Sequence, residues 1–72
     1  MTTKEYLQQA KDRALRETDM GGMWASFHKD MNEHPELKDH ISLPLGMSLM
    51  FHGHWKTDSD CIKFILSISN GL

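Results

Sequence analysis

The chain contains a long segment without charged side chains. No Asp, Glu, Lys or Arg occurs in the sixteen residues from His40 to Trp55, whose sequence is HISLPLGMSLMFHGHW. The first forty residues carry fourteen charges, whereas the last thirty-two carry four. A water-soluble chain must bury a segment as apolar as this one, against its own first half or against another molecule. In so short a chain, we expect both kinds of burial.

The length predicts one domain spanning residues 1–72. A domain of this size buries only about 60% of the surface that its unfolded chain exposes. Disulfides cannot add stability, because Cys61 is the only cysteine. A lone thiol is typical of a reducing compartment, so we expect a cytoplasmic protein. Dimerisation is then the usual remaining way to bury more surface.

The N-terminal half predicts two amphipathic helices. The first is expected over residues 3–18, where Thr2 and Glu5 have the spacing of a capping box. Its apolar stripe consists of Tyr6, Leu7, Ala10, Ala14 and Leu15, and Gln8, Lys11, Asp12 and Arg16 occupy the opposite face. The segment from Asp19 to Gly22 should break this helix, because two glycines disfavour helix.

A second helix is expected to follow and to reach about Asn32. Its apolar face consists of Met23, Trp24, Phe27 and Met31. Pro35 disfavours helix at His34, so residues 35–40 should form a turn or a short third helix.

The uncharged segment fits two structures. Ile41, Leu43, Leu45, Met47, Leu49 and Phe51 alternate with other residues, as in a strand. Pro44 and Gly46 are unfavourable inside a strand, and Leu and Met favour helix. We therefore prefer a helix over residues 44–52.

The C-terminal segment has the same ambiguity. Thr57 and Asp60 could cap a helix, which the Asn70-Gly71 pair would end. Residues 61–69 also alternate and are rich in β-branched side chains. The prediction is an all-α bundle of three to four short helices. The alternative is an α+β fold, with the two N-terminal helices packed on a C-terminal β-hairpin that a dimer could extend.

No motif indicates catalysis, and we expect neither an enzyme nor a cofactor. Cys61 lies beside Asp58 and Asp60, which disfavour a reactive thiolate. The five histidines raise the alternative of a metal-binding or metal-responsive protein that uses His52, His54 and either His40 or Cys61. Their spacing does not match a known zinc motif, so no metal site is assigned.

Nucleic acid and membranes are unfavoured partners. The net charge is −2, and the cations that could bind nucleic acid, Lys4, Lys11, Arg13 and Arg16, are interrupted by acidic residues. Nucleic-acid binding is therefore the weaker alternative. The uncharged segment contains three histidines, two serines, two glycines and a proline, which is too polar for a membrane span.

The abundance of Met and Trp favours binding to another protein. Six methionines and two tryptophans occur in 72 residues, and both residue types are enriched at interfaces. We therefore expect a small non-catalytic, regulatory protein-binding module that forms a homodimer. Its predicted contact residues are Trp24, Met47, Met50, Phe51 and Trp55.

Overall fold

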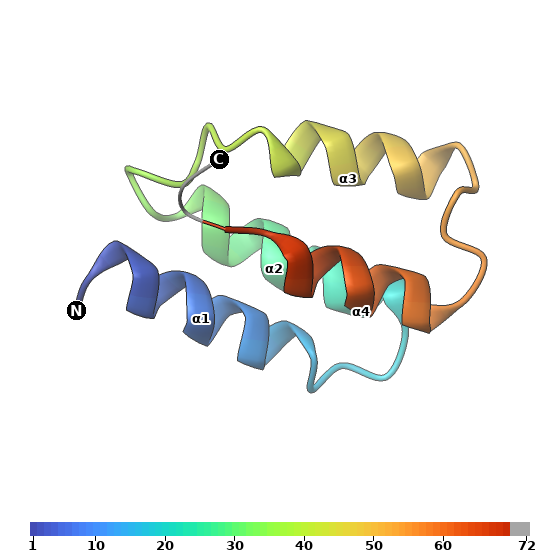
Figure 1. Cartoon of the computed structure of the whole chain (residues 1–72), viewed down its shortest axis with the longest axis horizontal. Coiled ribbons are helices and arrows are strands. Elements are labelled where there is room, and N and C mark those ends of the chain that lie inside the picture. Colours follow the sequence, from blue (N-terminus) through green and yellow to red (C-terminus); the bar gives the residue numbers. More distant parts are fainter. Residues whose placement is uncertain (70–72) are drawn as a thin grey trace.

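The computed structural model describes residues 1–69, which form four helices and no strand. They are α1 (Thr3–Ala14), α2 (Met20–Asn32), α3 (Ser42–Phe51) and α4 (Asp58–Ser67). Figure 1 shows α4 between α1 and α3, with α2 behind them. The predicted all-α bundle is confirmed, and the alternative hairpin over residues 41–51 and 61–69 is not formed. The predicted stop at Asn70-Gly71 lies outside the described residues.

The two N-terminal helices follow the predicted stripes. The capping box of α1 is present, since Glu5 N donates to Thr2 Oγ1 at 3.1 Å and Thr2 N donates to Glu5 Oε1 at 3.2 Å. Met23, Trp24, Phe27 and Met31 of α2 are all buried, as expected. The first helix ends at Ala14, earlier than residue 18. Beyond it the backbone bonds to the residue three positions earlier instead of four: Arg16 N donates to Arg13 O and Glu17 N to Ala14 O.

Contrary to the prediction, the glycine pair does not interrupt the helical structure but lies within a helix. Gly21 and Gly22 lie inside the first turn of α2, which Asp19 caps by accepting from Gly22 N at 2.7 Å. The amide of Met20 donates to Asp58 Oδ1 at 3.0 Å, which joins the start of α2 to the start of α4. These caps satisfy amides that lack partners inside the helix, so the first turn tolerates both glycines.

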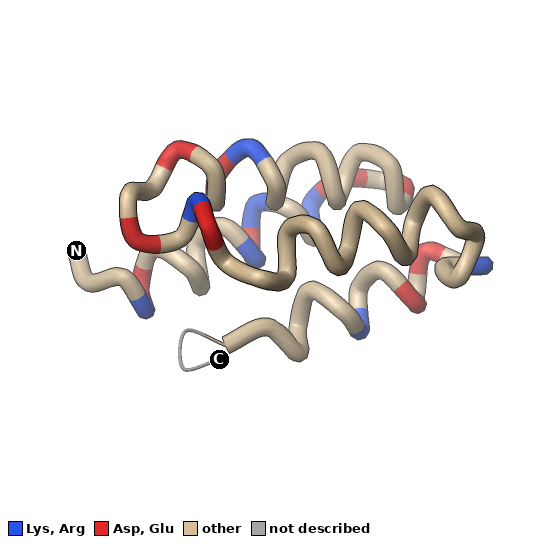
Figure 2. The backbone as a smooth tube through the Cα atoms, turned by 90° about the horizontal axis from the view of Figure 1, so that it is seen from above, with Lys and Arg blue, Asp and Glu red and all other residues tan. Residues whose placement is uncertain are grey.

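The uncharged segment forms α3, which begins two residues earlier than predicted. Pro44 is the third residue of this helix, where a missing N–H removes no hydrogen bond within the helix. His40 accepts from Ser42 N at 3.1 Å, so an imidazole caps the helix start. Residues 35–39 form turns. Figure 2 shows α3 without charged residues, in contrast to α1 and α2.

Lys11 is a correction to the predicted polar face of α1. It is buried, and its Nζ donates to Leu66 O and Ile68 O at the end of α4. The ammonium thereby satisfies carbonyls that a helix end leaves without partners. Burial lowers the pKa of Lys11. This lysine holds α1 against α4 instead of facing solvent.

Candidate functional site: an apolar surface on α3

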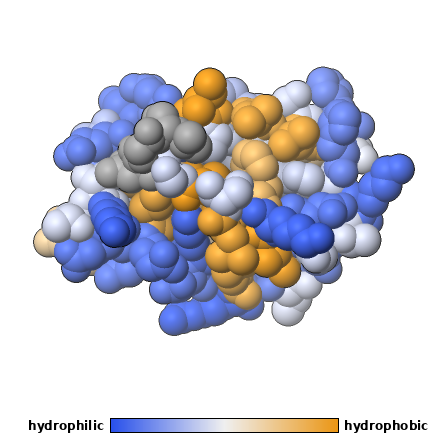
Figure 3. Space-filling view, in the orientation of Figure 1, coloured by the Kyte–Doolittle hydropathy of each residue, from blue (hydrophilic) through white to orange (hydrophobic). Residues whose placement is uncertain are grey.

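The outward side of α3 is apolar. Phe51 is 74% exposed, Ile41 is 66% exposed and Leu45 is 49% exposed. We call these three residues the α3 surface: Leu45 and Phe51 lie on α3, and Ile41 is its N-cap residue. The half-buried Met47 and Met50 lie on the same helix. Single exposed apolar residues are common, but here three occur within the eleven residues from Ile41 to Phe51, which carry no charge. Figure 3 shows hydrophobic side chains over α3 on one face of the molecule.

A close approach to Trp24 holds α3 in place. A Cβ added to Gly46 would lie 2.3 Å from Trp24 Cη2, so only glycine fits there. Trp24 is 2% exposed, and its ring centroid lies 5.7 Å from that of Phe27, 5.5 Å from that of Trp55 and 5.9 Å from that of Phe64. This aromatic cluster occupies the side of α3 opposite the α3 surface, so the buried side of the helix is already filled.

The five predicted contact residues have different positions. Phe51 is exposed, as a contact residue should be, and Met47 and Met50 are half-buried. Trp24 and Trp55 require a correction, since they are 2% and 8% exposed and belong to the core. The physical reason is that the two indoles pack edge to face, at 71°, between α2 and the loop before α4. They offer almost no surface to a partner.

Sequence reasoning missed Ile41 and Leu45 as exposed apolar residues. The sequence prediction starts this helix at Pro44, whereas in the structure it starts at Ser42 and Ile41 is the N-cap residue. The useful signal was helical spacing: Ser42, Leu43 and Gly46 share the buried side, and residues 41 and 45 lie one turn apart on the other side. With the helix starting at Ser42, this spacing would have assigned Ile41 and Leu45 to the exposed side.

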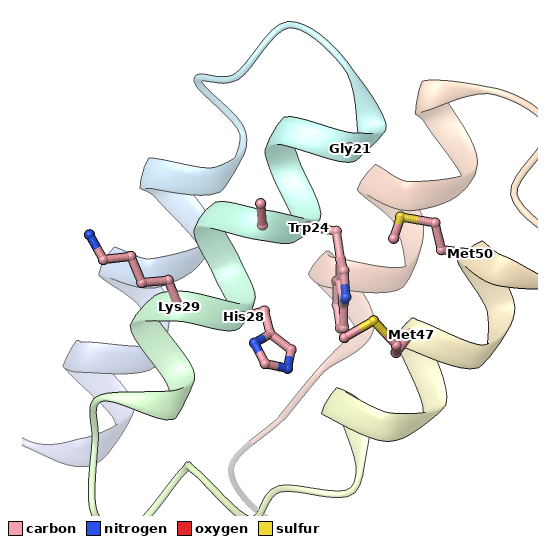
Figure 4. A pocket seen from close by; sticks show the side chains of 7 residues that line it. Gly21, Trp24, His28, Lys29, Met47 and Met50 are labelled. Atoms are coloured by element: carbon pink, nitrogen blue, oxygen red, sulfur yellow. The ribbon is translucent and has the colours of Figure 1, made fainter.

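A pocket of about 330 Å³ lies between α2 and α3. We call it the α2–α3 pocket; it is lined by Gly21, Trp24, Ala25, His28, Lys29, Met47 and Met50. Figure 4 shows Trp24 between the two helices, with His28 on the α2 side and the two methionines on the α3 side. The walls are almost wholly apolar, and the few polar groups come from Trp24, His28 and Lys29.

The histidines are not assembled into a metal centre. Within residues 1–69, no group of three or more His, Cys, Asp or Glu side chains could hold a metal ion. His40 bridges Ser42 and the carbonyl of Ser69, and His52 pairs with Ser48 Oγ at 3.2 Å. The rings of His52 and His54 are 6.5 Å apart. These described contacts favour structural roles over the ligand set considered from the sequence.

Cys61 lacks the setting of a nucleophile. Its side chain is buried, and the thiol donates to Met20 O at 3.8 Å. Burial, and secondarily the charge of Asp58, raises the pKa of Cys61 to about 11. The thiol therefore remains protonated near neutral pH, where only the thiolate attacks.

Two of the four cations considered for nucleic-acid binding are engaged within the fold. Lys11 bonds to the end of α4, and Arg13 Nε donates to Asp30 Oδ2 at 2.8 Å. Of the remaining pair, Lys4 lies in the first turn of α1 and Arg16 lies two residues beyond its C-terminal end. Two separated cations do not form the clustered basic face that phosphate binding requires.

None of the helices described over residues 1–69 has the length and apolar character needed to cross a membrane. Comparison with protein-family models, curated proteins and solved structures gave no match. The α3 surface and the α2–α3 pocket are therefore the features of the molecule that bear on its function.

Proposed function

We propose that this protein is a small non-catalytic binding module that acts through the α3 surface, and that a second copy of the chain is a partner. The observation that carries this proposal is the exposure of Ile41, Leu45 and Phe51 on a helix without charge. A partner that covers them removes apolar side chains from water without desolvating any charged group on α3. A regulatory role in the cytoplasm fits this chemistry and the lone reduced thiol.

The expected strength of self-association follows from the side chains involved. Full burial of a Leu, Ile or Phe stabilises by about 1.5–3 kcal/mol. Six such side chains in a symmetric pair would contribute roughly 9–18 kcal/mol, against about 4–15 kcal/mol of lost freedom on association. Because the three residues are already partly covered, the lower part of the first range applies. We therefore propose a weak dimer, whose population rises with protein concentration.

The test uses charge substitutions on the α3 surface. Leu45→Glu and Phe51→Glu each place a charge in the proposed contact and should reduce the mass measured by light scattering after size exclusion. Leu66→Glu is the matched control, because Leu66 is 54% exposed but lies on α4. It should leave association unchanged. Circular dichroism should show the same helix content in all three variants.

Met50→Glu is a less direct probe. Met50 is half-buried and packs against the core, so the charge would disturb folding as well as contact. We still expect Met50→Glu to weaken association. If Leu45→Glu and Phe51→Glu associate as the wild type does, or if Leu66→Glu alone dissociates the protein, the proposed surface is not the interface.

A further inference from the structure

The indole nitrogen of Trp24 is a buried donor without an acceptor. Trp24 is 2% exposed, and its Nε1 has no hydrogen-bond partner among residues 1–69. An unsatisfied buried donor is unfavourable, and native proteins rarely retain one without a reason. Figure 4 shows this nitrogen on the ring edge that faces the viewer, between His28 and Met47. Because Trp24 lines the α2–α3 pocket, its unpaired indole N–H lies at the wall of that pocket.

The two ends of the pocket differ in charge. Gly21 lies beside the Asp19 carboxylate, whose Oδ1 is 3.5 Å from the position of an added Cβ. Lys29 lies at the other end, eight residues further along α2, which is about 12 Å, and His28 lies one residue before it. Neither side chain forms an ion pair within the described residues, and α3 supplies no charge. An anionic group is therefore favoured at the His28 and Lys29 end.

The volume of this open pocket suits a small occupant. At about 30 Å³ for each water-sized atom, 330 Å³ holds about eleven non-hydrogen atoms. This volume lies at the lower end of the range for small-molecule sites. The flexible thioethers of Met47 and Met50 adapt to different shapes and can move aside from the indole nitrogen. Lys29 points away from Trp24 in Figure 4, but its flexible stem can turn toward the pocket.

We infer that the α2–α3 pocket binds a small amphipathic monocarboxylate of about eight carbons in all, a size that fits the pocket volume. The tail lies along Ala25, Met47 and Met50, and the carboxylate lies at the His28 and Lys29 end. One carboxylate oxygen accepts the Trp24 indole N–H, which gives the buried donor its partner. This site is separate from the α3 surface and does not depend on self-association.

Octanoate is the probe, with the ¹⁵N-labelled full chain and NMR detection of the two indole N–H signals. Replacing Trp55 by Phe identifies the Trp24 signal. We expect octanoate to move the Trp24 proton downfield in a saturable way, because hydrogen bonding deshields it. Acetate, which lacks the tail, and octyltrimethylammonium, which lacks the acceptor, should leave it in place at equal concentration.

Two substitutions test the site. Ala25→Phe should abolish octanoate binding, because Ala25 is an exposed pocket residue and the ring fills the volume. Gln9→Phe, at an exposed position of α1, is the control and should bind octanoate normally. Lys29→Gln should weaken binding by about two- to five-fold, the range for losing an exposed ion pair.

Several results would overturn the inference. A shift with acetate means an adventitious ion only, and equal binding of octyltrimethylammonium means unspecific adsorption of the tail. A shift that survives in Ala25→Phe places octanoate elsewhere. A Trp24 signal that responds to protein concentration but not to octanoate means that a second copy occupies the pocket. None of these results depends on whether Leu45→Glu or Phe51→Glu reduces self-association.

Discussion

At the scale of residues, Trp24 contributes both packing and an unused donor. Its indole contacts the rings of Phe27, Trp55 and Phe64, and the backbone of Gly46 approaches it from α3. The same side chain forms part of the α2–α3 pocket. Stability and ligand binding are therefore separable at this position only by substitutions that keep the ring volume.

Trp24→Ala should unfold the chain. Loss of a buried Trp typically costs about 3–5 kcal/mol. A 72-residue domain has a total stability of roughly 4–10 kcal/mol, so the loss is of the same order. Trp24→Phe keeps much of the aromatic packing, removes the unpaired N–H and should remain folded. Urea denaturation followed by circular dichroism measures both; a Trp24→Ala variant as stable as the wild type would contradict the central place of this ring.

Cys61 should make stability depend on pH in the alkaline range. Its pKa is raised from 9.0 to about 11 in the folded chain, so the folded state binds the thiol proton more tightly than the unfolded state does. The resulting stabilisation is complete below pH 9 and is lost as the pH rises from 9 to about 11. Burial raises the pKa of Tyr6 in the same direction and lowers that of Lys11, which acts oppositely.

The Cys61→Ala variant isolates the thiol from these other groups. Its free energy of unfolding in urea is measured from pH 7 to about pH 11. Above pH 9 this free energy should fall less steeply than that of the wild type. The difference between the two proteins should therefore narrow across this window. A difference that stays constant with pH would show that the Cys61 thiol titrates equally in both states.

At the scale of helices, the attachment of α3 depends on one glycine. Gly46→Ala adds a methyl group 2.3 Å from Trp24 Cη2, so either the indole or α3 must shift. We expect a destabilisation of about 1–3 kcal/mol, even though Ala favours helix by about 1 kcal/mol. Gly21→Ala is the control, since its nearest neighbour is an ordinary 3.5 Å contact. Urea denaturation should separate the two, and equal stabilities would mean that α3 is free to adjust.

The helices were predictable to different degrees. The capping box at Thr2 and the stripes of α1 and α2 specified those helices, because local spacing and burial agree there. The alternation from Ile41 to Phe51 fitted a strand, whereas Pro44 and Gly46 favoured the helix that the structure has. The close approach of Gly46 to a tryptophan 22 residues away could not be predicted from local sequence. Lys11 donates to carbonyls more than 50 residues away in the sequence. Trp55, in the loop before α4, packs against the ring of Trp24. Neither long-range contact leaves a local sequence signal.

At the scale of the whole molecule, the charged residues are distributed so that one helix carries none. Charged residues lie on α1, α2, α4 and the turns after α2, while α3 carries none (Figure 2). The aromatic cluster lies in the core, whereas Ile41, Leu45 and Phe51 lie outside the core. A chain of this size that keeps such a patch exposed gains buried surface when a partner covers it.

Sedimentation equilibrium of the wild-type chain tests this claim most directly. At low micromolar concentration the mass should approach the monomer value of 8.3 kDa, and at higher concentration it should rise toward twice that value. Phe51→Glu should remain at the monomer mass over the same range. A wild-type chain that sediments as a single 8.3 kDa species at every concentration would contradict self-association through α3.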